Sequence, residues 1–223
     1  MALPWNGLVT VSDIERDNLG QPYKAPTPEQ TEAAIEQAIL DMQGNVETFI
    51  NRELIVREYC ETFGHGNRWK YNLALQKFEL SLKNWPVVQV ISVTANDGDD
   101  LTSEFSLDTE TYDNYVLLTD SVRVGIKVRY YAGYRRRDQE LSDIQAYSDM
   151  HAGLTELPPI LPSDIRSCVT ELVLNRLTVA KNQQFGVGQT VKGIAGNELQ
   201  YTKPDSYFSS SRLRRLRKHV RLR

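Results

Sequence analysis

The residue types that most often carry catalysis or bind metals are present in this chain but scattered along it. Its three histidines, His65, His151 and His219, have no companion at the spacing of a metal site or of a nucleophile with its base. The two cysteines, Cys60 and Cys168, form no CxxC motif, so neither a disulfide framework nor a zinc site is indicated. We therefore predict no catalytic residue, no metal site and no cofactor, and hence a protein that is not an enzyme.

A glycine-containing stretch from Gly186 to Gly188 matches only the start of a dinucleotide-binding motif. Val191 stands where that motif needs a further glycine, a predicted helix precedes the stretch instead of a strand, and no GK[ST] follows. The carboxylates lie on the solvent faces of predicted helices or in turns, and no pair is distinguished from solubilising charge. These observations argue against nucleotide binding and against acid–base catalysis.

The strongest charge feature is the C-terminal segment. Residues 203–223 carry about +7, which leaves about −10 on residues 1–202 and gives the net charge of −3. The apolar residues of this segment recur at three- and four-residue spacing and would form a narrow stripe on a basic helix. Such a segment can dock on an acidic protein surface or on phosphates, although a solvated terminus remains an alternative. The candidate partner-binding residues are Arg212, Leu213, Arg214, Arg215, Leu216, Arg217, Lys218, Val220, Arg221 and Arg223.

The overall composition is that of a folded cytoplasmic protein. Of the 223 residues, 40% are hydrophobic and 25% are charged. No apolar run approaches the roughly 20 residues that span a bilayer. Residues 1–10 lack the pattern of a signal peptide.

The central predicted element is a half-buried strand at 121–134. Its apolar residues follow a two-residue period, while Arg123, Lys127, Arg129 and Tyr131 fall on the other side. The apolar side comprises Val122, Val124, Ile126, Val128, Tyr130 and Ala132.

Two long amphipathic helices flank this strand in the sequence. Thr27, Pro28 and Gln30 supply an N-cap, a first-turn proline and a capping-box partner, so a helix is predicted over 28–52. Ser163 begins a second helix over 163–182. Shorter helices are expected within 8–19, from Ser12 or Asp13, and after Ser209. The expected inward faces are Ile35, Ala38, Ile39, Met42, Val46, Phe49 and Ile50 on the first long helix, and Ile165, Cys168, Val169, Leu172 and Leu177 on the second.

The region 53–134 is predicted to be antiparallel β. We expect a hairpin around Gly64–Asn67, strands at 77–82 and 87–93, and a strand at 115–119 paired with the central strand. Residues 135–162 are expected to form an inserted connection on the surface. One core should bury Ile39, Phe49, Val124, Ile126, Leu172 and Leu177 together.

The predicted fold class is therefore α+β. It is a small helical bundle, with two long helices plus short N-terminal and C-terminal helices, and an antiparallel β-sheet or hairpin excursion. A single domain should cover 1–182, followed by a flexible glycine-containing arm and basic segment over 183–223.

The order of these elements resembles the head-to-tail connector, or adaptor, proteins of tailed bacteriophages. The resemblance covers roughly residues 8–180. It lies in PVVQVISV, in a V-x-Y-x-A-G-Y strand ending at Tyr134, in the prolines of PPILP, and in the helix SDIRSCVTELVLNRL with Arg176 near its end.

The resemblance implies a structural virion protein at the head-to-tail interface. It implies a ring, typically of twelve copies, that binds the portal and tail or tail-completion proteins and extends the channel for passing genomic DNA without reading its sequence. To close a ring, each copy must contact the next through two different surfaces. Arg135, Arg136 and Arg137 and the acidic first long helix are candidate surfaces of opposite charge for it.

Two other functions remain open from the residues alone. A nucleic-acid-binding protein could use the basic tail, with phosphate contacts and steep salt dependence, although the acidic body argues against it. A hydrolase with a site completed by oligomerisation is a third possibility, but no nucleophile or base is indicated.

Overall fold

A computed structural model describes residues 7–17, 28–64, 69–108, 116–123, 125–147, 153–184, 210–217 and 219–220 of the chain. The chain divides into two compact units. The helical unit comprises Met1–Arg52 and Pro162–Arg223, and the β unit comprises Glu53–Leu161. The β unit therefore interrupts the helical unit in the sequence.

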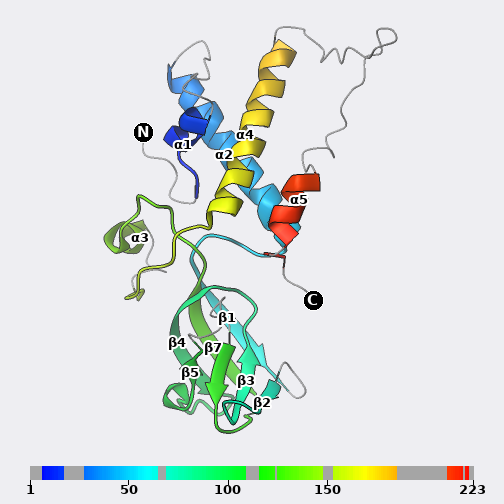
Figure 1. The fold of residues 1–223 in the computed structure, drawn as a ribbon. Coiled ribbons are helices and arrows are strands. Elements are labelled where there is room, and N and C mark those ends of the chain that lie inside the picture. Colours follow the sequence, from blue (N-terminus) through cyan, green and yellow to red (C-terminus); the bar gives the residue numbers. More distant parts are fainter. Residues whose placement is uncertain are drawn as a thin grey trace. The chain divides into compact units, whose positions relative to one another are not determined.

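Two long helices pack against each other in the helical unit, and two short helices pack against the second of them (Figure 1). The predicted bounds of the long helices, 28–52 and 163–182, each differ from the observed ones by two residues at the C-terminal end. The four helices are α1 (Val11–Asp17), α2 (Pro28–Ile50), α4 (Ser163–Gln184) and α5 (Ser210–Arg217).

The predicted inward faces of the long helices are confirmed. Phe49 is half-buried, and the remaining predicted residues are buried, namely Ile35, Ala38, Ile39, Met42, Val46 and Ile50 on α2 and Ile165, Cys168, Val169, Leu172 and Leu177 on α4. The sequence did not predict that Gln43 is buried too, where its Oε1 accepts the backbone N–H of Leu8 at 3.0 Å.

The start of α1 and the end of α2 follow known capping chemistry. Helix α1 begins after Thr10, because the Thr10 hydroxyl accepts the Asp13 N–H and the Asp13 carboxylate accepts the Thr10 N–H, each at 3.0 Å. The predicted start at Ser12 or Asp13 is therefore slightly late. Helix α2 ends where Asn51 adopts a left-handed φ of 57° and the Arg52 N–H bonds to the Glu47 carbonyl at 3.1 Å.

The β unit contains two antiparallel sheets (Figure 1). One has the strand order β1-β7-β4 and the other the order β2-β3-β6-β5. The strands are β1 (Arg57–Phe63), β2 (Trp69–Asn72), β3 (Lys77–Ser81), β4 (Val87–Ala95), β5 (Ser106–Leu107), β6 (Val116–Thr119) and β7 (Ile126–Ala132). A 3-10 turn, η1 (Thr102–Glu104), and helix α3 (Leu141–Tyr147) complete the unit.

Strand β7 lies at the centre of its sheet, and the predicted alternation is confirmed only in part. Tyr131, expected on the polar side, is buried, whereas Val122, expected on the buried side, is exposed and precedes the strand. Lys127 and Arg129 are exposed, whereas the alternate residues of the strand face a core shared by both sheets. That core contains Phe63, Leu80, Leu82, Val87, Val93, Leu101, Leu117, Ile126, Val128, Tyr130 and Ala132. It consists only of β-unit residues, so the prediction that helical stripes share a core with Ile126 is wrong. Val124, also assigned to that core, lies outside the described residues.

Two predicted strand pairings are wrong. Strand β1 pairs with β7, with Phe63 opposite Ile126, and does not form a hairpin with β2. Strand β6 pairs with β3 and β5, and not with β7. Both errors came from pairing neighbours in sequence, which local pattern favours but does not require.

The connection 135–162 is less peripheral than predicted. It contains α3, and Ile144, Leu154 and Leu161 within it are buried. The helical bundle with a β excursion, and the single domain over 1–182, stay predictions.

Candidate functional site

The first candidate site is the basic C-terminal helix α5, which packs on α4 within the helical unit. Leu216 is fully buried there. Val220, after the helix, is half-buried, and its N–H bonds to the Arg217 carbonyl at 3.2 Å. Residues 210–217 therefore form a helix that packs on α4.

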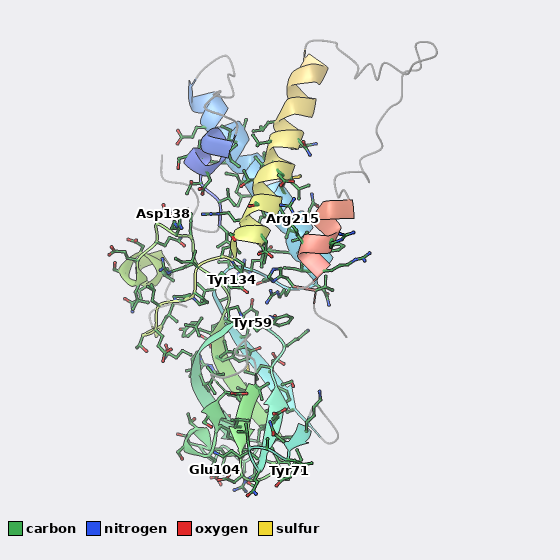
Figure 2. The ribbon with its side chains drawn as sticks, in the orientation of Figure 1. Tyr59, Tyr71, Glu104, Tyr134, Asp138 and Arg215 are labelled. Carbon is green, nitrogen blue, oxygen red and sulfur yellow. The ribbon has the colours of Figure 1, made fainter. Side chains whose placement is uncertain are left out.

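Two polar contacts tie α5 and the turn after it to α4. The Arg215 guanidinium (Figure 2) donates from Nη2 to Glu171 Oε1 at 2.8 Å and to Oε2 at 3.0 Å. This hydrogen bonding to Glu171 raises the pKa of Arg215. His219 Nε2 lies 2.8 Å from Asp164 Oδ2. Asp164 and Glu171 are seven residues apart on α4, two helical turns, so they lie on one face of the helix.

The predicted arm residues therefore have different environments. Arg214 and Arg217 are exposed, while Arg215 and Leu216 are used in contacts with α4. The predicted apolar stripe is thus partly covered within the same chain. The side chains of Arg212 and Leu213, and residues Lys218, Arg221 and Arg223, lie outside the described part of the chain.

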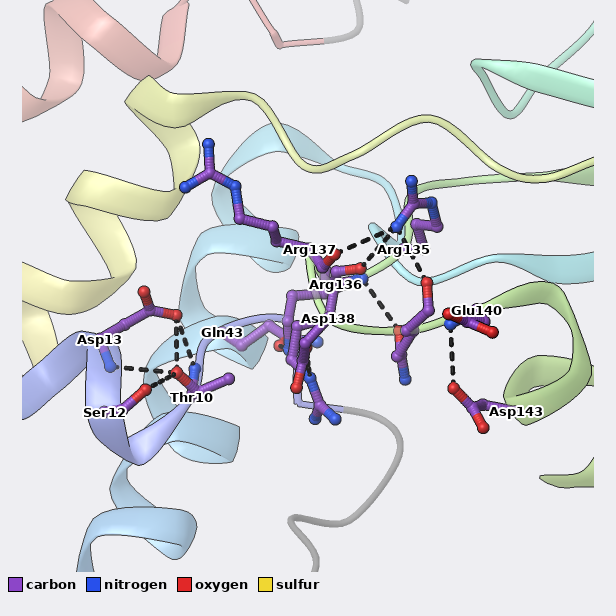
Figure 3. A network of polar contacts seen from close by, with 12 residues as sticks. Thr10, Ser12, Asp13, Gln43, Arg135, Arg136, Arg137, Asp138, Glu140 and Asp143 are labelled. Carbon is purple, nitrogen blue, oxygen red and sulfur yellow. Dashed lines mark hydrogen bonds and ion pairs between the residues drawn. The ribbon is translucent and has the colours of Figure 1, made fainter.

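The second candidate site is the arginine run after β7, and its first member has a structural role (Figure 3). Arg135 donates from Nε to the Pro158 carbonyl and from Nη1 to the Gln139 carbonyl, both at 2.9 Å. Nη1 also lies 3.3 Å from the carbonyl oxygens of Arg136 and Arg137. One guanidinium thus satisfies several loop carbonyls and joins the two ends of the connection.

The other two arginines differ from Arg135. Arg136 pairs with Asp138, and its backbone N–H donates to the buried Gln139 side chain at 2.9 Å. Arg137 is exposed. If this run contributes to a ring interface, Arg137 is the member whose side chain is most open to a partner.

The sequence did not predict an ion pair between two strands of the β unit. Arg129 on β7 donates to Glu58 on β1, with Nη2 at 2.6 Å from Oε1, and this bond raises the pKa of Arg129. The pairing depends on the β1–β7 register, which places Glu58 and Arg129 diagonally across neighbouring strands. No local signal in the sequence identifies it.

Metal sites and membrane-spanning helices were the other two features considered, and the described residues show neither. Within the described ranges, no group of three or more His, Cys, Asp or Glu residues is arranged to hold a metal ion. Among the helices described, none is both long and apolar enough to cross a membrane. His65, His151 and Gly186–Gly188 lie outside the described residues.

No protein-family model matches the sequence, and no curated protein matches it. Solved structures do match. A chain from the neck of a native gene transfer agent (GTA) particle, computed with C12 symmetry, has a TM-score of 0.50 and 14% identity, covering 100% of this chain and 93% of that one. A chain from the neck of an empty GTA particle, computed with C6 symmetry, has a TM-score of 0.51 and 12% identity, covering 100% of this chain and 94% of the other. The fold is therefore one found in the neck of a phage-like particle.

Proposed function

We propose that this protein is a structural virion protein, a head-to-tail adaptor that forms a closed ring between the capsid portal and the tail. The observation that carries the proposal is the similarity of fold to neck chains over 100% of this chain. The C12 and C6 symmetry with which those necks were computed supports a ring here, and we propose twelve copies. The connector-like order of sequence elements supports the portal and tail proteins as partners.

The proposed role needs no catalytic site. The ring would extend the DNA channel and let genomic DNA pass without sequence-specific recognition. We place it in the virion, at the head-to-tail interface, after assembly in the host cytoplasm. We also propose that the chain has the α+β fold of a connector protein.

The C-terminal helix is the proposed portal-docking element. Arg214 and Arg217 are exposed on α5 and could meet an acidic surface, while Leu216 and Arg215 hold the helix on α4. Docking could therefore use the exposed side of α5 in place, or it could release α5 so that Leu216 enters the partner. Both routes require residues 205–223.

The ring is tested by measuring the mass of the purified full chain by light scattering, with negative-stain images of the same sample. We expect closed rings, alone or when purified portal is added. A protein that stays monomeric in both conditions would contradict the proposal.

Portal docking is tested by removing residues 205–223. The shortened chain should keep its folded body but fail to attach to portal-bearing heads. Replacing Arg214 and Arg217 by Ser is the matched variant that keeps Leu216. If these changes affected only salt-dependent binding to DNA, and left portal attachment unchanged, nucleic-acid binding would replace portal docking as the role of the segment.

A further inference from the structure

The exposed large apolar side chains of the described residues all belong to the β unit. Among the described large apolar residues of the helical unit, by contrast, none is exposed. Leu73 is 82% exposed, Tyr71 51% and Leu157 48%. The complete set is Tyr71, Leu73, Leu75, Val122, Leu157 and Ile160.

Four of these residues lie at one end of the four-stranded sheet and form what we term the tip patch: Tyr71, Leu73, Leu75 and Val122. Residues 73–76 are the turn between β2 and β3. Phe78 on β3 is opposite Thr119 on β6, so the chain leaving β6 at 120–123 runs to the same end as that turn. The Tyr71 and Phe78 rings pack against each other, with 4.9 Å between their centroids. The apolar inner face of the sheet therefore extends to this end.

The other two residues, Leu157 and Ile160, form what we term the base patch. Ile160 forms a β-bridge with Arg135, which follows the last residue of β7 by three positions. The Arg135 guanidinium holds Pro158, between the two apolar residues, at 2.9 Å. The base patch is therefore fixed to the C-terminal end of β7.

Strand β7 separates the two patches. The loop with Val122 leads into β7 at Ile126, whereas the base patch adjoins the chain after Ala132. Seven residues of strand at about 3.3 Å each correspond to about 23 Å between the ends. Figure 2 shows the same separation, with Tyr71 and Glu104 at one end of the β unit and Tyr134 at the other.

Two unlike apolar patches at opposite ends of one unit suit a particular kind of assembly. A patch that meets its own copy pairs two subunits about a two-fold axis and stops there, whereas a ring needs each copy to present two different, matching surfaces. The flanking charges are opposite in sign and therefore complementary, because Lys77 follows the tip turn and Glu156 precedes Leu157. Exposed apolar surface of this kind is typical of protein interfaces.

We propose that the tip patch of one copy binds the base patch of the next copy around the ring. The partner is a second copy of this chain, and the contact is heterologous. The inference rests on the ring proposed above and names the surfaces that build it. It also moves the expected ring interface from the arginine run itself to the apolar residues that Arg135 positions.

The test uses two full-length variants, each with one patch disabled. Leu73→Asp disables the tip patch and Leu157→Asp disables the base patch. Ala146→Asp, at an exposed position on α3, is the control with the same added charge. An unchanged thermal midpoint in each variant shows that the fold is kept.

We expect the control to form rings and each patch variant alone to lose the ring peak and elute as monomer. Mixed in equal amounts, the two patch variants should form dimers and nothing larger, because the intact tip of one can bind the intact base of the other. A Lys77→Glu variant should also assemble less well, and Glu156→Lys in the same chain should restore it.

Other outcomes would overturn the inference in distinguishable ways. If both patch variants formed rings like the unsubstituted chain, the patches would not be the interface, while the ring function would stand. If Leu157→Asp alone formed dimers that Leu73→Asp abolished, the tip would bind another tip. If the unsubstituted chain formed no ring with or without portal, the proposed function would fail and this inference with it.

Discussion

The hydroxyl of Tyr130 on β7 donates a hydrogen bond to the carboxylate of Glu61 on β1. The same carboxylate accepts the Lys83 backbone N–H at 2.7 Å, and the Tyr130 hydroxyl accepts the Asn84 backbone N–H at 3.2 Å. Two paired strands and the connection between β3 and β4 therefore meet at one polar cluster. Because Tyr130 is fully buried, its hydroxyl needs hydrogen-bond partners inside the protein, and this cluster provides them.

Tyr130→Phe should lower the free energy of unfolding by about 1–3 kcal/mol, because it leaves Glu61 and the Asn84 N–H without their shared partner. Urea denaturation measures the change. Tyr59→Phe is the matched control, since the Tyr59 hydroxyl donates at 3.2 Å to Glu53 in an exposed contact. An equal loss of unfolding free energy in the two variants would show that the buried cluster stabilises the fold no more than the exposed contact does.

Stability should fall at alkaline pH, in part through Tyr130. Burial, and then the charge of Glu61, raise the pKa of Tyr130 above its ordinary value of 10.0. The unfolded chain therefore releases this proton first, so the contribution is present below about pH 10 and is lost as the pH rises further. Urea midpoints at about pH 8 and pH 11 should differ less in Tyr130→Phe than in the unsubstituted protein. An identical pH dependence would contradict the assignment.

Ile126→Asp should unfold the β unit, with a loss of more than about 4 kcal/mol, because it places a carboxylate in the core shared by the two sheets. Lys127→Asp changes the exposed neighbour in the same strand and should be nearly neutral. Circular dichroism and limited proteolysis report the outcome. A soluble Ile126→Asp protein with an unchanged thermal midpoint would mean that the central strand is misplaced.

Gly133→Ala should cost at least about 2 kcal/mol. Gly133 has a φ of +124°, and an added Cβ would lie 2.5 Å from the Ile55 carbonyl oxygen. Gly64→Ala is the control, because nothing lies within 4 Å of the added carbon there. Thermal melts of the two variants should separate clearly, and matching melts would rule out this close approach.

Leu216→Ser should release α5 from α4, since it removes the buried anchor of the contact. Hydrogen exchange at the α5 amides should then accelerate strongly, while exchange in α2 should not change. Arg217→Ser, at an exposed position on the same helix, should leave protection intact. The Arg215–Glu171 ion pair is partly exposed and alone is worth only about 0.2–1 kcal/mol, so protection that survived Leu216→Ser would require another anchor.

Local chemistry made the two long helices predictable, but it left the strand pairings open and did not indicate α3. The inward faces of α2 and α4 follow from apolar residues spaced three and four apart, and Pro28 marks the start of α2 at the observed residue. The partner of β1 is set by long-range packing, since Phe63 pairs with Ile126 across more than sixty positions in the sequence. Period-two patterning identifies a strand and its buried face but says nothing about which strand lies beside it.

The residues of the candidate sites could be identified from the sequence, but the groups that they contact could not. Charge and spacing indicated the basic C-terminal helix, yet Leu216 and Arg215 contact α4 because Asp164, Glu171 and the buried stripe of α4 are complementary to them. The arginine run was interpreted as surface charge. Arg135 instead bonds to carbonyl groups that exist only once the turn and the Pro158 segment have folded.

The division of the helical unit by the β unit has a consequence during protein synthesis. On the ribosome, α2 emerges more than one hundred residues before α4, which provides its packing partner. The β unit, being continuous from Glu53 to Leu161, can fold in that interval, while the apolar stripe of α2 still lacks the packing surface that α4 provides. A chain stalled near Leu161 should thus present a folded sheet unit together with a chaperone-binding helix.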